Sequence, residues 1–184
     1  MKRIVILFSG EGTNLANLIN KIHLKHAAIV CAITNNPDAG GIAKARAAGI
    51  PVEILDHTLF ERREAYDEAL VDTIRDYNPD LVVLCGFMRI LTPVFTSQIR
   101  SINLHPALLP AFKGARAIER SFESDEKVCG VSVHWVTDEL DGGEIILQKS
   151  FTKNSSDTLE EFSAKIREIE HEILPLSVVK ILND

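Results

Sequence analysis

Two polar side chains, Asn103 and His105, stand at the end of an apolar segment, within the sequence Asn-Leu-His-Pro. Residues two apart in a strand point to the same side, so the amide and the imidazole would face one place. If the segment is a strand of an open α/β sheet, that place lies beyond its carboxyl end, where such sheets bind ligands. An amide donor and an imidazole set together suit acyl transfer, such as attack of an amine on a formyl carbon, because both can stabilise the oxyanion that forms.

A carboxylate beside the imidazole would complete such a site, and Asp141 is the candidate. It lies in the polar loop 137–143, whose closing Gly-Gly pair permits a tight turn. Its charge would favour the protonated imidazole, and it could help a water molecule carry a proton. Each residue has a plainer reading, because a histidine after a strand is commonly structural and Asp-Gly-Gly is commonly just a turn. By themselves these residues predict a polar cleft and no more.

A glycine-rich loop, Ser-Gly-Glu-Gly-Thr-Asn-Leu at residues 9–15, indicates a second kind of chemistry. It joins an apolar run to a helical pattern, and the free amides and dipole at a helix N-terminus bind phosphate. Thr13 and Asn14 would add side-chain donors. The dinucleotide fingerprint would require a glycine where Leu15 stands. A tight turn capped by Thr13 or Asn14 is the alternative reading.

The segments that must position these groups alternate between strand and helix patterns. Apolar, β-branched runs are typical of strands buried on both faces, and apolar residues at helical spacing lie between them. Strands are predicted at residues 3–8, 28–34, 51–55, 81–85, 101–104, 129–136 and 144–151. Helices are predicted at residues 15–22, 41–48, 62–77 and 118–123, with a last helix starting at Asp157. Asp157 and Glu160 have capping-box spacing, and Pro175 is expected to interrupt the end of this last helix.

This alternation predicts an α/β fold: a single-domain, Rossmann-like, open and mostly parallel sheet flanked by helices, with an antiparallel strand pair at one edge. A chain of 184 residues fits one domain, residues 1–184. No apolar run approaches the roughly 20 residues needed to span a bilayer, and the run after Met-Lys-Arg is too short for an export signal. We therefore expect a cytoplasmic protein without a membrane partner.

Charge and cysteine content narrow the function classes further. The net charge of −6 argues against a nucleic-acid partner, because such proteins usually carry a basic surplus. Cys31, Cys85 and Cys129 are widely spaced and form no CxxC pair. Cys31 and Cys85 fall in apolar runs and are expected to be buried free thiols in a reducing compartment. No metal site is expected.

Four stretches of the chain, taken in order, resemble the folate-dependent formyltransferases. They are residues 8–15, 86–91, 103–110 and 136–143, with weaker matches at 63–67 and at Glu170-His171 before Leu174-Pro175. Within the family they are most similar to the enzymes that formylate glycinamide ribonucleotide in purine (IMP) synthesis. The resemblance spans nearly the whole chain and implies a transferase that uses 10-formyltetrahydrofolate as co-substrate.

The resemblance also implies roles at the matching positions. The implied catalytic residues are Asn103, His105 and Asp141. The residues implied to bind the ribonucleotide are Gly12, Thr13, Asn14, Gly86, Arg167 and Glu170. Those implied to bind the folate are Arg63, Met88, Arg89, Ile90, Leu91, Asn103 and Asp138. Arg167 and Glu170 have a plainer reading as a solvated ion pair on one helix face. The N-terminal half would carry the phosphate site and the C-terminal half the catalytic and folate site, in a monomer or weak homodimer that acts on small molecules.

Two positions depart from this pattern. Glu11 stands where the family usually has asparagine, and a carboxylate beside a phosphate is unfavourable unless it points away. Residues 112–117, Phe-Lys-Gly-Ala-Arg-Ala, look closer to formyltetrahydrofolate deformylase, which hydrolyses the same folate with the same trio.

The rival readings fit the chain less well. The deformylases normally carry an N-terminal regulatory domain and lack the glycine-rich loop, because water needs no phosphate site. The methionyl-tRNA formyltransferases carry a C-terminal tRNA-binding domain and a basic surface. A nucleotide-binding module without catalysis would leave the trio unexplained. The ribonucleotide transferase is therefore the prediction, and the deformylase is the alternative.

Overall fold

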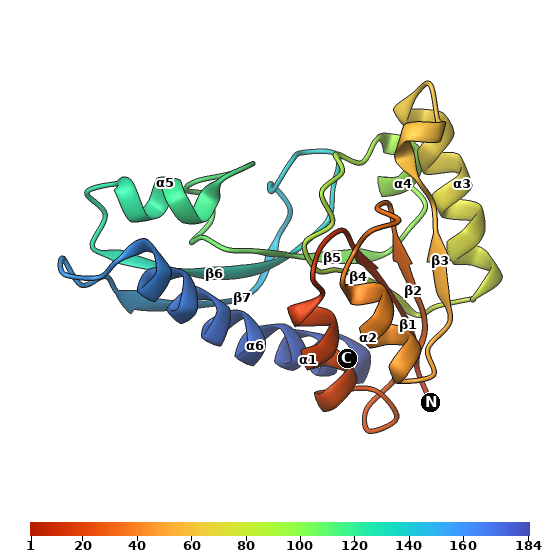
Figure 1. Cartoon of the computed structure of the whole chain (residues 1–184), viewed down its shortest axis with the longest axis horizontal. Helices are drawn as coiled ribbons and strands as arrows, with labels where there is room; N and C mark the ends of the chain where they lie inside the picture. The colour runs from red at the N-terminus through yellow and green to blue at the C-terminus, as the bar shows by residue number, and fades with distance from the viewer.

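The computed structural model describes all 184 residues, which form one seven-stranded sheet with helices on both faces (Figure 1). The strands are β1 (Arg3–Phe8), β2 (Ala28–Thr34), β3 (Val52–Ile54), β4 (Leu81–Leu84), β5 (Ser101–His105), β6 (Val128–Trp135) and β7 (Ile145–Thr152). Their order across the sheet is β3-β2-β1-β4-β5-β6-β7. The first five are parallel, and β6 and β7 are antiparallel at one edge. The predicted fold class is confirmed.

The helices join and cover these strands. They are α1 (Thr13–Lys21), α2 (Gly41–Ala47), α3 (Arg63–Asp76), α4 (Pro93–Thr96), α5 (Ala117–Glu123), α6 (Leu159–Asn183) and the 3₁₀ turn η1 (His57–Leu59). The predicted elements are present with small shifts at their ends. The turns α4 and η1 were not predicted, because segments of three or four residues are too short to show a helical period. None of the helices combines the length and the apolar character needed to cross a membrane.

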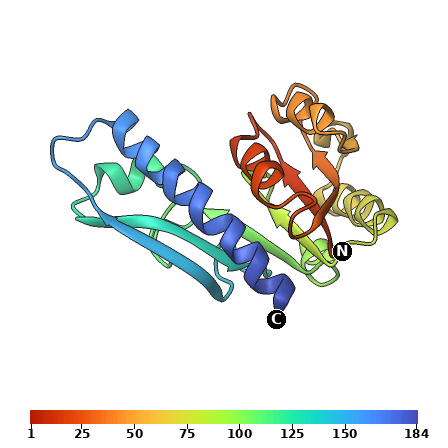
Figure 2. The same ribbon diagram turned by 90° about the horizontal axis from the view of Figure 1, so that it is seen from below.

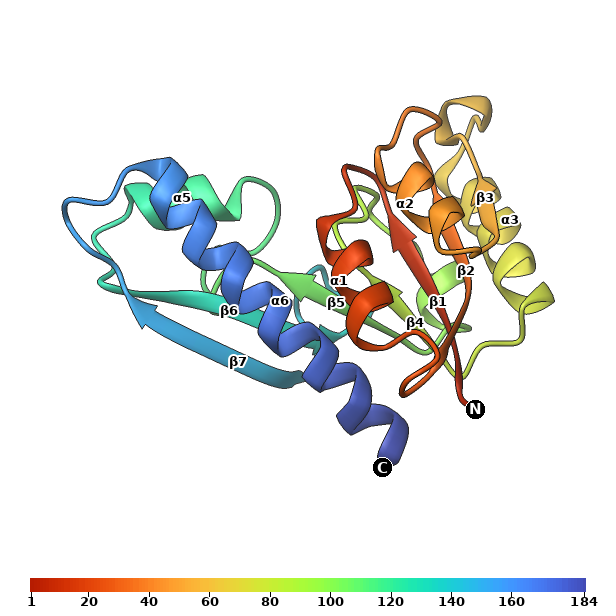
Figure 3. The same ribbon diagram turned by 60° about the horizontal axis from the view of Figure 1, so that its bottom comes forward.

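Successive side chains of the central strands enter two different cores. Ile4, Ile6 and Phe8 of β1 belong to the core beneath α1, α2 and α6, whereas Val5 and Leu7 pack with α3 and α4. Figure 3 shows α1, α2 and α6 in front of the sheet, and Figure 2 shows α6 running along β6 and β7. Both faces of the central sheet are therefore buried, as the unbroken apolar runs predict.

The same alternation in β5 turns the polar residues away from α6. Ile102 and Leu104 belong to the α6-side core, so Asn103 and His105 point to the opposite face. On β6, Val133 shares the α6-side core, and its neighbour His134 therefore faces the same way as Asn103. These polar side chains gather on one face of the sheet, as predicted for Asn103 and His105.

Helix α6 continues through Pro175 to Asn183, so the prediction that Pro175 interrupts it is wrong. Proline has no N–H, and the carbonyl four residues earlier, that of His171, loses its helical partner. This carbonyl instead accepts hydrogen bonds from Asn17 Nδ2 at 2.9 Å and Lys21 Nζ at 2.7 Å, both on α1. The neighbouring helix therefore satisfies the group that the proline leaves free.

The start of α6 also differs from the prediction by one residue. Thr158 and Glu161 form the capping box, each side chain bonding the other's backbone N–H. The predicted pair, Asp157 and Glu160, is therefore wrong, and the Asp157 carboxylate instead accepts a bond from Lys165 Nζ at 2.7 Å. Elsewhere the three cysteines are free and buried, as predicted for Cys31 and Cys85.

Candidate active site

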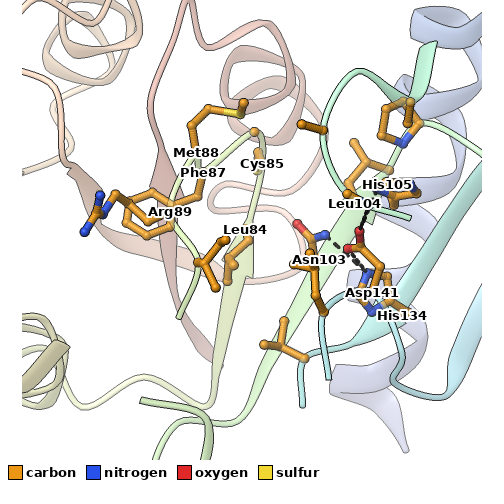
Figure 4. Close-up of a pocket in the computed structure, with 18 of the residues that line it drawn as sticks. Leu84, Cys85, Phe87, Met88, Arg89, Asn103, Leu104, His105, His134 and Asp141 are labelled. Atoms are coloured by element: carbon orange, nitrogen blue, oxygen red, sulfur yellow. Dashed lines mark hydrogen bonds and ion pairs between the residues drawn. The ribbon is translucent and has the colours of Figure 1, made fainter. Parts of the chain in front are cut away.

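A cleft of about 600 Å³ lies at the carboxyl ends of β1, β4 and β5. Its walls are the loop 10–14 after β1, the segment 84–91 of β4 and the loop after it, the end of β5, residues 114–117, the loop 136–141 after β6, and Glu170 of α6. Figure 4 shows the residues that follow β4 facing the polar group from β5, β6 and the loop after β6. The cleft occupies the position expected for the ligand site of an open parallel sheet.

The three predicted catalytic residues line this cleft together, with Asp141 next to two histidines (Figure 4). One carboxylate oxygen of Asp141 lies 3.5 Å from His105 Nδ1, and the other lies 3.5 Å from His134 Nε2. Asn103 Nδ2 is 3.2 Å from the same His134 Nε2. The structure therefore brings together an amide, two imidazoles and one carboxylate, all but the amide being buried.

His134 is the member of this group that sequence reasoning missed, because no motif in the sequence includes it. The alternation of β6 already placed it opposite Val133, but only the register of β6 against β5 sets it beside Asn103. Its Nδ1 donates to the Trp135 carbonyl at 2.9 Å, which turns Nε2 toward Asn103 and Asp141. A single sequence carries no local signal for this contact, because the register between two strands is set by the tertiary structure.

The protonation states of the pair depend on burial as well as on charge. Burial lowers the pKa of His105, and the opposing effect of the Asp141 charge does not overcome it. Asp141 favours the protonated imidazole, as predicted, but burial has the larger effect in the free protein. For Asp141, burial alone would raise the pKa, but bonds from His134 and from the Gly114 N–H at 2.7 Å hold that pKa below its ordinary value. The site thus holds an ionised carboxylate beside a largely neutral imidazole at neutral pH.

The loop that carries Asp141 depends on its glycines, as predicted. Asp141 has a positive φ of 51°, a conformation that aspartate tolerates better than most residues with a side chain. A Cβ at Gly143 would lie 1.8 Å from the Trp135 carbonyl oxygen, so no other residue fits there without moving β6. This close packing holds the loop against the end of β6 and directs the carboxylate into the cleft.

The loop after β1 has the features of an anion site. Gly12 has a φ of 73°, and a Cβ there would lie 2.7 Å from Gly41 Cα, so the turn requires glycine. No side chain caps α1, which leaves its first amides free to bind an anion. One N–H of Asn14 Nδ2 donates to Glu170 Oε2 at 3.1 Å, which leaves the other for the predicted donor role. The buried Oδ1 of Asn14 has no partner in the protein.

Glu11, the departure within this loop, has its carboxylate packed against Gly40 at the start of α2. A Cβ on Gly40 would lie 2.4 Å from Glu11 Oε2, and Lys44 Nζ donates to the Glu11 main-chain oxygen. A negative charge is favourable near a helix N-terminus and near a lysine. The conflict between this carboxylate and a bound anion is therefore reduced.

The segment 88–91 forms the opposite wall and is anchored at both ends. Met88 N donates to Ser9 Oγ at 2.8 Å, and Thr92 donates through N and Oγ1 to the buried Asp67 at 2.6 and 2.7 Å. Between these anchors, the peptide groups of residues 89–91 make no hydrogen bond within the protein. The side chains of Met88 and Ile90 are exposed. The segment thus presents free peptide groups and apolar surface to a ligand.

Of the remaining predicted site residues, some line the cleft and others lie outside it. Gly86 and Asp138 line the cleft, and Asp138 accepts a hydrogen bond from Thr96. Arg89 turns its guanidinium over the Tyr66 ring, 5.4 Å from the centroid and away from Asn103 (Figure 4). Arg63 and Arg167 are exposed and lie outside the lining of the cleft. No group of three or more His, Cys, Asp or Glu side chains is arranged to hold a metal ion.

Comparison with known proteins gives a consistent picture. The formyl transferase family model matches residues 2–178. The chain is 41% identical over 179 residues to phosphoribosylglycinamide formyltransferase of Escherichia coli (strain K12), covering 95% of this chain and 84% of that protein. It is 38% identical over 182 residues to the enzyme of the same name from Haemophilus influenzae, covering 97% and 86%. The crystal structure of phosphoribosylglycinamide formyltransferase from Campylobacter jejuni superimposes with a TM-score of 0.96 at 52% identity, covering 98% of this chain and 97% of that one.

Proposed function

Because the chain belongs to the formyl transferase family, we propose that it transfers the formyl group of 10-formyltetrahydrofolate to the amine of glycinamide ribonucleotide, a step of purine synthesis. The observation that carries the proposal is the meeting of Asn103, His105 and Asp141 in one cleft with the free N-terminus of α1. Acyl transfer requires the three polar side chains, and binding of a phosphorylated acceptor requires the free helix N-terminus.

The ribonucleotide phosphate binds the free amides of α1, and its amine reaches the polar group at the end of β5. The amine nitrogen attacks the formyl carbon, and the carbonyl oxygen becomes an oxyanion that accepts a bond from Asn103 Nδ2. Once protonated, His105 places a positive charge beside the oxyanion, while its Nε2 bonds the Phe112 carbonyl and the adjacent Asp141 stabilises the imidazolium at Nδ1. The bond from the formyl carbon to folate N10 then breaks, releasing tetrahydrofolate and the formylated ribonucleotide.

Proton balance requires that the amine lose a proton and that folate N10 gain one. Asp141 is ionised and lines the cleft, so it can hold a water molecule that carries this proton. A covalent enzyme intermediate is not required. Cys85 is the thiol in the lining, and burial raises its pKa far above the ordinary value, so it is not a thiolate. These features support direct attack by the amine.

The segment 88–91 suits the folate ring. A pterin has flat apolar faces and an edge of hydrogen-bonding nitrogen and oxygen atoms. The free peptide groups of residues 89–91 match that edge, while Met88, Ile90 and Leu140 offer exposed apolar surface. The buried Nε of Arg89 has no partner in the protein and adds one more donor near this wall. Both halves of the chain therefore contribute to each of the two proposed substrate sites.

The test is to incubate the protein with 10-formyltetrahydrofolate and to follow tetrahydrofolate release by absorbance, with and without glycinamide ribonucleotide. We expect release only with the ribonucleotide, and formylated product by mass spectrometry. Equal release without it, with formate as product, would identify a deformylase. No release in either mixture would contradict both assignments.

Asn14→Ala is expected to raise KM for the ribonucleotide by about tenfold, with a much smaller change in KM for the folate. The variant removes both the open acceptor and the bond that orients Glu170, and a hydrogen bond to a charged group is worth about 1.5–3 kcal/mol. Steady-state kinetics with each substrate varied in turn measures the effect.

The matched control is Asn17→Ala. Asn17 lies one turn along α1 and also bonds α6, through the His171 carbonyl, but it does not line the cleft. It should leave both KM values near those of the unaltered protein. Equal effects of the two variants would mean that Asn14 serves only to hold α1 against α6.

A further inference from the structure

The loop between β5 and α5 contacts both His105 and Asp141. The Phe112 carbonyl accepts a hydrogen bond from His105 Nε2 at 2.8 Å, and the Gly114 N–H donates to Asp141 Oδ2 at 2.7 Å. Each contact uses a main-chain atom, so the orientation of two site residues depends on the backbone path of this loop. A shift of the loop would move the imidazole and the carboxylate together.

That backbone path is not one the loop would adopt by itself. Phe112 and Arg116 have φ values of 56°, and Gly114 has a φ of 83°. Left-handed conformations are costly for residues with a side chain and persist only where the surroundings hold them. The loop therefore needs an external support.

Arg120, on α5, provides this support. Its Nη2 donates to the Phe112 and Lys113 carbonyls at 3.1 and 2.5 Å, and its Nε donates to the Ala115 carbonyl at 3.0 Å. Its guanidinium also lies 6.0 Å from the centre of the Phe112 ring. The fixed fork of a guanidinium can hold several carbonyls in one geometry, which an ammonium on a flexible stem cannot do equally well. Arg120 does not line the cleft.

We propose that Arg120 is a positioning residue for formyl transfer, which orients His105 and Asp141 by holding three carbonyls of the loop 112–115. This inference rests on the proposed function for its kinetic consequences. It assigns a purpose to the segment in which the chain departs from its relatives in purine synthesis.

The electrostatic surroundings of His105 give a readout that does not depend on turnover. His105 is faced by Asp141 from the loop after β6, by His134 from β6 and by Arg120 from α5. Burial lowers the pKa of His105, Asp141 and the bond to the Phe112 carbonyl raise it, and the His134 and Arg120 charges lower it by smaller amounts. Because Arg120 and His105 share the Phe112 carbonyl, removing the guanidinium removes a nearby cation, which alone would raise the pKa of His105, and frees the acceptor that helps to hold this pKa up.

The experiment compares Arg120→Met, Arg120→Lys and the matched control Lys113→Met. The control removes the Lys113 cation from the loop that Arg120 holds. The Lys113 ammonium pairs with Glu139 at the surface and does not bond the loop carbonyls. We expect kcat to fall about 100-fold in Arg120→Met, because small misplacements of reacting groups have effects of that size, with KM for both substrates within about threefold. Arg120→Lys should recover part of this loss, and Lys113→Met should match the unaltered protein.

Titration of the His105 ring by NMR in the free protein supplies the second measurement. The pKa of His105 should fall in Arg120→Met, because the loop then no longer holds the Phe112 carbonyl and Asp141, which both raise it, against the imidazole. It should stay near its original value in Arg120→Lys, and a rise in Arg120→Met would mean that Arg120 acts only as a nearby charge. If Arg120→Met does not fold, the reduced kcat of Arg120→Lys decides the question. Unaltered kcat in the folded variants, with an unaltered His105 titration, would overturn the proposal. If the unaltered protein transfers no formyl group, the proposed function fails, and the NMR titration still tests the role of Arg120.

Discussion

Replacing Asp141 with asparagine is expected to lower kcat by about 1,000-fold, with far smaller changes in KM for either substrate. The substitution keeps the shape of the side chain but removes the only negative charge between His105 and His134. Without it, burial disfavours the imidazolium that the transition state needs, and the proton path from the amine loses its acceptor. Steady-state and single-turnover kinetics on the same variant measure the loss.

A matched control for this variant is Glu139→Gln. Glu139 lies in the same loop and borders the cleft, but its side chain is 71% exposed and pairs with Lys113 at the surface. Its loss should change kcat less than about threefold, because exposed ion pairs contribute little. Comparable losses in the two variants would show that the loop needs negative charge in general. Full activity of Asp141→Asn would remove Asp141 from the mechanism.

Asn103→Ala is expected to lower kcat by about 100- to 1,000-fold, the usual effect of losing one oxyanion donor. Asn103 Nδ2 is the amide donor at the end of β5, and no other side-chain amide lines the same part of the cleft. Because the bond strengthens only in the transition state, KM for the folate and the ribonucleotide should change little. Stopped-flow measurement of tetrahydrofolate formation, with both substrates saturating, isolates this step.

The companion variant Asn103→Asp separates the effect of hydrogen-bond donation by the amide from the effect of side-chain shape. Aspartate fills the same volume but can only accept hydrogen bonds when ionised, so it should be at least as slow as alanine. Activity near that of the unaltered protein in Asn103→Asp would show that Asn103 does not donate to the oxyanion. Its role would then be limited to holding His134 Nε2.

The sequence predicted the sheet well because its strands carry strong local signals. Runs such as Arg3–Phe8 are apolar at every position, and this pattern depends on burial and not on distant partners. Pro175 was misread for the opposite reason. A proline's effect on a helix depends on whether another group takes the freed carbonyl, and here Asn17 and Lys21 do so from 150 or more residues away.

The site was predicted in part for the same reasons. Asn103 and His105 follow from strand alternation, which is local, and their partnership with Asp141 came from resemblance alone. His134 was missed because its contact with Asn103 requires the register of two strands. The sequence indicated the direction of the Asp141 effect on His105 but not the opposing effect of burial, because the degree of burial is set by the folded cleft. The chemistry of a single residue and its place in a strand can be predicted from the sequence, whereas contacts between distant segments cannot.

The bond between Asn14 and Glu170 has a consequence for the order in which the chain folds. It joins residues 156 positions apart, and during synthesis α1 emerges long before α6. The parallel strands β1–β5 are complete by His105, so a nascent chain can pair them while the wall containing Glu170 has not yet been made. The five parallel strands can therefore pair before the cleft exists, and we expect catalytic competence only once the last helix has docked on the first.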